Sequence, residues 1–109
     1  MAVQSAAEIF ESRIPDRLKD KPDLVSSINA IYKFDVSGDG GGTWLVDLTQ
    51  EGGKVTAGDG EAACVISIVD QDLVDIVNGK LNAQMAFMSG KLKVSGEIGL
   101  AMKLGALLT

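Results

Sequence analysis

The sequence predicts an α+β fold in which one five-stranded, mostly antiparallel sheet is covered on one face by about five helices. Two observations lead to this prediction. Segments in which apolar and polar residues alternate follow one another between glycine-rich turns, and segments with helical spacing lie before and after them. The length of 109 residues fits one domain over residues 1–109.

Two helices are expected before the sheet. Ser5 and Glu8 have the spacing of a capping box, and apolar residues follow them at helical intervals, which predicts a helix over about residues 5–13. Pro15 is expected to end this helix. A second, short helix is predicted over residues 23–29.

Four strands are predicted next, because the apolar pattern changes to a period of two. Residues 30–37 and 43–49 alternate on either side of a glycine-rich tip, which is typical of a hairpin. Residues 54–57 form a short third strand after the Gly52-Gly53 turn. Residues 63–69 contain almost no polar side chain, which predicts a fourth strand with a central position in the sheet.

Two further helices are predicted after these strands. Asp70 is a suitable N-cap for a helix over residues 71–78, and Gly79 provides a stop. Asn82 is a suitable cap for a second helix over residues 83–89, which Gly90 is expected to end. In the predicted α+β layer, the helices lie against one face of the sheet.

The chain ends in a fifth strand and an unusually apolar segment. Residues 91–95 alternate cleanly and predict the strand. Residues 98–108 contain one charge, Lys103, and as a helix their apolar side chains would cover roughly 220° of the circumference at ~100° per residue. A helix lying on a sheet needs a stripe of roughly 100°. The surplus must contact another part of the core, a partner protein, or an apolar ligand between helix and sheet.

The sequence favours a binding module over an enzyme. It contains no histidine, the commonest general base and metal ligand, and the net charge of −5 argues against nucleic acid as a partner. Cys64 lies in an apolar strand and is interpreted as a core residue. Residues 35–46 imitate a calcium loop but place Val46 where a bidentate glutamate is required. No catalytic set, metal site or cofactor is predicted.

The compartment expected from the sequence is the cytoplasm. A single cysteine indicates reducing conditions, and the first residues lack the pattern of a secretion signal. No uncharged apolar run reaches the ~20 residues of a membrane-spanning helix. A peroxisomal location is the alternative, for which the terminal LLT provides no targeting signal.

The segment from Gly79 to Leu104, GKLNAQMAFMSGKLKVSGEIGLAMKL, closely resembles the signature of the sterol carrier protein type 2 family. It departs from the signature at Ala83, where proline is usual, and at Glu97, where Asn or Asp is usual. The hairpin and the C-x-I-x-I-x-D run over residues 64–70 also match the family in outline. The resemblance covers nearly the whole chain.

This resemblance implies an apolar tunnel between the sheet and its helices, with the last helix helping to close it. It also implies non-enzymatic binding and intracellular transfer or presentation of lipids: fatty acids, fatty acyl-CoA and sterols. The opposing hypothesis is a protein-interaction module whose apolar C-terminal helix docks on a lipid-metabolising enzyme. Hydrolase or isomerase chemistry on a bound acyl chain lacks a residue set that would perform it.

The candidate ligand-binding residues are one glutamine and the apolar side chains expected to face the tunnel: Trp44, Val46, Leu48, Ile76, Val77, Gln84, Met85, Phe87, Met88, Leu100, Met102 and Leu104. For each apolar residue, ordinary core packing is the alternative. Gln84 matches a glutamine of the family and is expected either to hold a lipid head group or to bond the backbone.

The expected partners are a lipid and, in the second hypothesis, a lipid-metabolising enzyme; the chain itself is expected to be a monomer. Lys80, Lys91, Lys93 and Lys103 form a modest basic zone in the second half of the chain. Two interpretations of this zone stay open, namely lysines that face solvent and transient contact with a membrane. The acidic net charge argues against steady adsorption to an anionic membrane.

Overall fold

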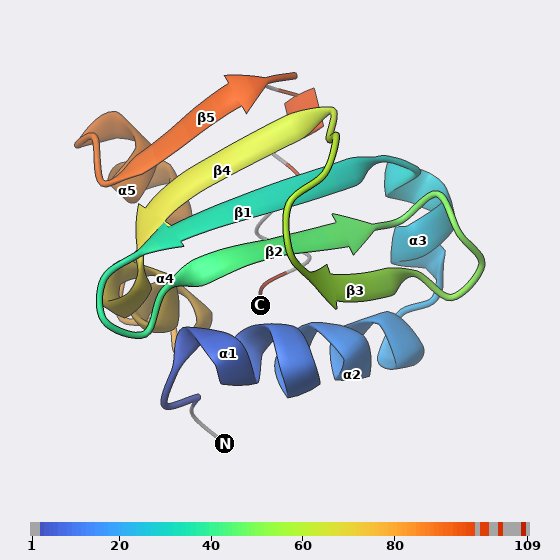
Figure 1. Cartoon of the computed structure of the whole chain (residues 1–109), viewed down its shortest axis with the longest axis horizontal. Coiled ribbons are helices and arrows are strands. Elements are labelled where there is room, and N and C mark those ends of the chain that lie inside the picture. Colours follow the sequence, from blue (N-terminus) through green and yellow to red (C-terminus); the bar gives the residue numbers. More distant parts are fainter. Residues whose placement is uncertain (1–2, 98, 101–102, 104–107, 109) are drawn as a thin grey trace.

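The computed structural model describes residues 3–97, 99, 100, 103 and 108. Five strands form one sheet in the order β3-β2-β1-β4-β5 (Figure 1). The elements in chain order are α1 (Ala6–Glu8), η1 (Ile9–Arg13), α2 (Ile14–Asp20), α3 (Asp23–Ile28), β1 (Ile31–Ser37), β2 (Gly42–Asp47), β3 (Lys54–Ala57), β4 (Cys64–Val69), α4 (Asp70–Val77), α5 (Ala83–Met88) and β5 (Leu92–Gly96).

The α+β class and the five strands are confirmed, but the sheet is mixed. β1 pairs antiparallel with β2 and parallel with β4, while the two outer pairs are antiparallel. The connection from β3 to β4 crosses in front of the sheet in Figure 1, so β4 enters beside β1. This connection contacts the strands that it crosses: Asp59 forms an ion pair with Lys33 of β1, and a Cβ at Gly60 would lie 2.6 Å from the Leu45 side chain of β2. Three of the four strand pairs are antiparallel, in agreement with a mostly antiparallel sheet. The parallel pairing of β1 with β4 was not predicted, because alternation identifies strands without identifying their neighbours.

The first helix is longer than predicted. α1, η1 and α2 are consecutive and run to Asp20, through Pro15. η1 is a π-helical turn, after which Pro15 stands in the first turn of α2, where a missing amide hydrogen is tolerated. Counting this helix once, the described residues contain four helices; the predicted fifth, over residues 98–108, lies mostly outside them.

The ends of the short helices agree with the predicted stops. Gly79 and Gly90 both have positive φ, and the following amides, of Lys80 and Lys91, donate to carbonyls five residues earlier. This is the Schellman arrangement, which satisfies carbonyls at a helix end. The predicted cap at Asn82 is confirmed, since its side chain accepts from two amides of α5.

Asp70 acts differently from the predicted N-cap. It is the first residue of α4, and Val69 holds the cap position. One carboxylate oxygen of Asp70 accepts from the amide of Gln71, and the other accepts from Gly40 at 2.9 Å. Asp70 therefore fastens the tip of the β1–β2 hairpin to the start of α4. A Cβ at Gly38 would lie 2.2 Å from this carboxylate, which explains the glycine-rich tip.

The core lies on the inner face of the sheet, between the strands and the helices. β1, β2 and β4 each turn alternate apolar residues toward it, as the period of two predicts. β4 is interior, although β1 holds the middle of the sheet. Cys64 is a buried member of this core, as predicted. Burial and the nearby Glu97 raise the pKa of its thiol, which keeps the thiol protonated.

Candidate functional site

The inner face of β2 carries three of the predicted site residues. Val46 and Leu48 are fully buried, and Trp44 is partly buried. Their common face follows from the strand period, and the hairpin register pairs Trp44 with Phe34 and Val46 with Tyr32. The middle of the sheet therefore presents a continuous apolar surface to the helices.

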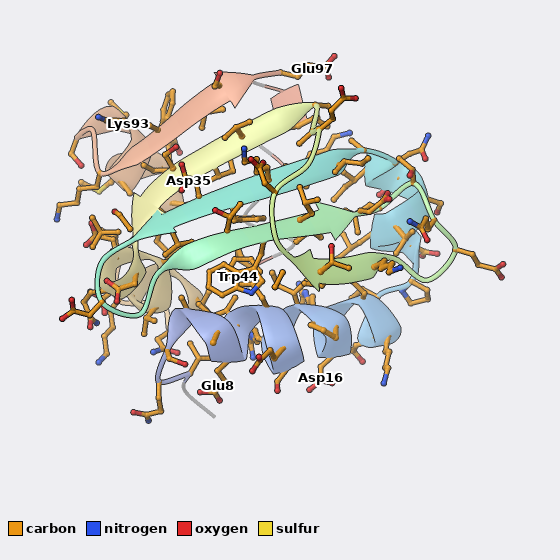
Figure 2. All side chains as sticks on the ribbon, viewed as in Figure 1. Glu8, Asp16, Asp35, Trp44, Lys93 and Glu97 are labelled. Atoms are coloured by element: carbon orange, nitrogen blue, oxygen red, sulfur yellow. The ribbon has the colours of Figure 1, made fainter. Side chains whose placement is uncertain are left out.

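Trp44 is covered by an aromatic side chain of η1. Phe10 stacks on it with ring centroids 4.5 Å apart and an interplanar angle of 10°. Phe10 also meets Phe34 edge-on, with centroids 5.0 Å apart. In Figure 2 the labelled Trp44 lies between β2 and the N-terminal helix. One end of the inner face is thus filled by three aromatic rings, a cluster that sequence spacing did not reveal because Phe10 is distant in the chain.

The predicted residues of α4 belong to the same core. Ile76 and Val77 are buried, together with Leu73 and Val74 of the same helix. Asn78, just after α4, exchanges two hydrogen bonds with the backbone of Val3, which ties the start of the chain to this helix. α4 is therefore a fixed wall of the inner face.

Two of the described residues after β5 belong to the core. Leu100 and Leu108 are both buried members of the hydrophobic cluster. The hydroxyl of Tyr32, on the central strand, donates to the carbonyl of Leu100 at 2.5 Å. Two predicted site residues of this segment, Met102 and Leu104, lie outside the described residues.

Tyr32 is a site residue that sequence reasoning missed. Its side chain is fully buried on the inner face, and burial, followed by the nearby Cys64, raises the pKa of the phenol well above its usual value. The hydroxyl is therefore a neutral donor within an apolar region. A tyrosine at an inward position of a strand was the available signal, since a buried phenol needs a partner.

The predicted residues of α5 lie apart from this inner face. Gln84, Met85, Phe87 and Met88 are all exposed, and Ala86 is the residue of α5 that is buried. A six-residue helix packed through one alanine has room for its larger side chains only on the solvent side. Among the described residues, the structure thus brings Leu100 together with the predicted residues of β2 and α4, and separates those of α5 from them.

Polar chemistry is sparse in the described part of the chain. A hollow of about 240 Å³ is lined by Arg13, Asp16, Arg17 and Asp20, all on the N-terminal helix and therefore away from the predicted apolar site. Among the described residues, no group of three or more potential metal ligands is assembled. No helix within those same residues has the length and apolarity to cross a bilayer.

Comparison with known proteins gives a family match over residues 11–109, to the SCP-2 sterol transfer family. A "Hydroxysteroid dehydrogenase-like protein 2" from Rattus norvegicus is 46% identical over 98 residues, which are 88% of this chain and 18% of the relative. "Peroxisomal multifunctional enzyme A" from Dictyostelium discoideum is 46% identical over 89 residues, or 79% of this chain and 20% of the relative. The chain thus spans about a fifth of either relative.

A solved structure with a similar fold is apo Sterol Carrier Protein 2 from Yarrowia lipolytica. It aligns with a TM-score of 0.79 and 32% identity, covering 92% of this chain and 86% of that one. The alignment includes most of the sheet and its helices, so the mixed α+β architecture described above is that of the matched family.

Proposed function

Because the chain belongs to the SCP-2 sterol transfer family, we propose that it binds and transfers lipids without making or breaking bonds in them. The ligand classes are fatty acids, fatty acyl-CoA and sterols. The proposed site is an apolar tunnel between the inner face of the sheet and the segment after β5. This proposal includes the whole chain, residues 1–109, as one lipid-binding domain.

The observation that carries this proposal is the burial of two residues that follow β5 in the core on the inner face. Leu100 and Leu108 are buried, and the Tyr32 hydroxyl bonds the Leu100 carbonyl. A ligand at this boundary would have apolar surface on the sheet side from Val46 and Leu48. Moving an alkyl chain out of water stabilises it by about 0.8 kcal/mol per methylene, so a long chain gains enough to bind without any charged partner.

The proposed ligand contacts divide by element. The inner-face candidates are Trp44, Val46, Leu48, Ile76, Val77 and Leu100, with Met102 and Leu104 proposed from their positions in the sequence. Since the α5 side chains face solvent, Met85, Phe87 and Met88 are proposed to contact lipid outside the tunnel. Gln84 is also exposed. Its proposed ligand is therefore a lipid head group at the molecular surface.

A displacement titration tests the proposal. Delipidated protein is saturated with a fluorescent fatty acid, and unlabelled palmitate, palmitoyl-CoA and cholesterol then compete for it. Saturable binding that an alkyl or sterol competitor reverses is the expected result. A folded protein that shows no saturable binding of any of these ligands contradicts the proposal. Trp44 provides a second signal, since it is the single tryptophan and lies on the inner face.

The alternative function is a protein-interaction module that serves a lipid-metabolising enzyme. It is favoured by the relatives, whose names denote enzymes of which the matched region is about a fifth. Native mass spectrometry of the purified protein separates the two hypotheses. Retained lipid on a monomer supports lipid binding, whereas a lipid-free dimer that depends on concentration supports the alternative. The name of the Dictyostelium relative makes the peroxisome the compartment to test beside the cytoplasm.

A further inference from the structure

α5 exposes an unusual amount of apolar surface. Met85 is 67% exposed, Phe87 45% and Met88 78%. Among the described residues, the other large apolar side chain with comparable exposure is Val69, at 44%. Three of these four side chains therefore come from one six-residue helix, which contacts β5 at the end of the sheet (Figure 1).

This exposure does not arise from a loosely held helix. The Asn82 side chain accepts from the amides of Gln84 and Met85, and the amide of Lys91 donates to the carbonyl of Ala86. Ala86 anchors the helix in the core. Backbone caps, the buried Ala86 and the partly buried Ala83 hold α5, so the exposed parts of the three large side chains are available to contact something else.

Positive charge surrounds the same helix. Lys80 and Lys91 directly follow the glycines that end α4 and α5, and Lys93 is on β5; all three are exposed. No acidic residue occurs between Asp75 and Glu97, in a chain whose net charge is −5. Within the described part of the chain, none of the three lysines forms an ion pair. Figure 2 shows the labelled Lys93 at the end of the sheet where β5 meets α5.

We propose that this face docks reversibly on the surface of an anionic bilayer. The α5 docking surface is defined by Lys80, Met85, Phe87, Met88, Lys91 and Lys93. Apolar side chains that insert at the head-group boundary, with lysines beside them, form the usual chemistry of interfacial binding. Each lysine close to an anionic leaflet contributes attraction that falls off within a Debye length.

Two magnitudes favour a bilayer as the occupant. A stable protein interface buries roughly 800 Å² on each partner, whereas three of the four exposed large apolar side chains in the described residues come from a single six-residue helix. The acidic net charge does not prevent docking, because charges are screened beyond about 10 Å at 0.1 M salt. The molecule measures 32 × 30 × 24 Å, so acidic groups on its far side lie outside that range when α5 meets the surface.

The docking proposal rests on the proposed function in one respect, because a lipid carrier would load or release its lipid while it contacts a membrane. Its test, however, measures vesicle binding directly. Full-length protein is floated with vesicles of phosphatidylcholine alone, or with about 30 mol% phosphatidylserine, at low and at high salt. Binding is expected to the anionic vesicles and to weaken with salt.

The apolar part of the surface is tested with Met85→Ser/Met88→Ser. Partitioning onto anionic vesicles is expected to fall roughly tenfold, because two apolar side chains no longer leave water. Leu45→Ser is the control, since it removes a partly exposed apolar side chain from β2, which lies three strands away from β5. Equal binding by the double variant and the control overturns the proposal.

The charged part is tested with Lys91→Glu/Lys93→Glu against Lys19→Glu/Lys21→Glu. All four lysines are exposed, and both variants change the net charge equally. Only the first pair is expected to lose vesicle binding, by roughly tenfold or more. Equal losses in the two variants would show that net charge alone is responsible, and this result overturns the proposal. Absence of vesicle binding by the unmodified protein also overturns it, and would be expected if the surface bound an acidic protein instead.

Failure of docking is distinguishable from failure of the proposed function. The displacement titration is repeated on the α5 variants without vesicles, where unchanged affinity for the fluorescent fatty acid is expected. Loss of vesicle binding with an intact titration supports docking through α5. Vesicle binding by a protein that shows no saturable lipid binding would sustain the docking proposal and refute the tunnel.

Discussion

Tyr32 places a hydrogen-bond donor in the middle of an apolar core. Its buried hydroxyl donates a hydrogen bond to the carbonyl of Leu100, which lies 68 residues later in the chain. Buried polar groups stabilise a structure only while their partners remain in place, so this bond couples the C-terminal segment to the central strand. Tyr32 thus links the central strand of the sheet to Leu100, which follows β5.

The first prediction concerns Tyr32→Phe. Loss of the hydroxyl leaves the Leu100 carbonyl without its donor, which is expected to lower the free energy of unfolding by about 1–2 kcal/mol. Urea denaturation followed by circular dichroism measures this change. Val36→Ala, which removes a buried side chain from the same strand without touching a hydrogen bond, is the control for a general packing loss.

Tyr32 also predicts a dependence on alkaline pH. Burial raises the pKa of the phenol in the folded state, so an unfolded chain loses this proton first, at a pH of about 10. The stabilisation is therefore complete below pH 10 and decreases as the pH rises beyond it. The wild-type protein should lose stability more steeply than Tyr32→Phe above pH 10. Parallel slopes for the two proteins would contradict this assignment.

Asp70 connects two elements through one carboxylate. Replacing it in Asp70→Ala removes the acceptors of the Gly40 and Gln71 amides, and a loss of about 1 kcal/mol is expected, because both bonds are exposed to solvent. Thermal unfolding measures the change. Asp72→Ala removes a carboxylate from the same first turn of α4 and controls for the helix dipole. An equal loss in both variants would indicate that only the dipole interaction matters.

At the scale of elements, the proposed lipid site depends on Leu100, which follows β5. Leu100→Asp is expected to weaken binding of a fluorescent fatty acid at least tenfold, since a charge would enter an apolar boundary. Val69→Asp places the same charge on an exposed position and should leave affinity unchanged. Circular dichroism of both variants verifies folding. Unchanged affinity in folded Leu100→Asp removes this residue from the proposed site.

The elements also show which features of the fold sequence patterns predict and which they do not. Strand periods, the caps at Ser5 and Asn82 and the stops at Gly79 and Gly90 depend on neighbouring residues, so local spacing predicted them. The parallel pairing of β1 with β4 depends on a crossing connection, and the passage of the first helix through Pro15 depends on a π-helical turn. Neither has a local signature.

The candidate site divides in the same way. β2 and α4 have enough residues for their period to distinguish an inner from an outer side, and Val46, Leu48, Ile76 and Val77 are buried together. α5 has six residues, too few for a period to identify its buried side, and its large side chains turned out to face solvent. Tyr32 and Phe10 reach partners far along the chain, which spacing alone does not reveal.

At the scale of the whole molecule, every described helix and strand except β3 contributes a buried residue to one hydrophobic cluster, and Val55 of β3 packs against it. This cluster extends from Val3 to Leu108 and includes residues of the helices and of the inner sheet face. A ligand between the sheet and the C-terminal segment would therefore contact most of the structure at once. Its binding energy would stabilise the folded state as a whole.

The last prediction follows from this linkage. Palmitate at about 100 times its dissociation constant should stabilise the folded protein by about 2.7 kcal/mol, which corresponds to a rise in melting temperature on the order of 10 °C for a chain of this size. Butyrate at the same free concentration is the matched ligand control, because its short chain removes little apolar surface from water. Differential scanning calorimetry of delipidated protein makes the measurement. A shift with both ligands would indicate binding of the carboxylate, and a shift with neither would mean that the inner face is packed solid beneath Leu100.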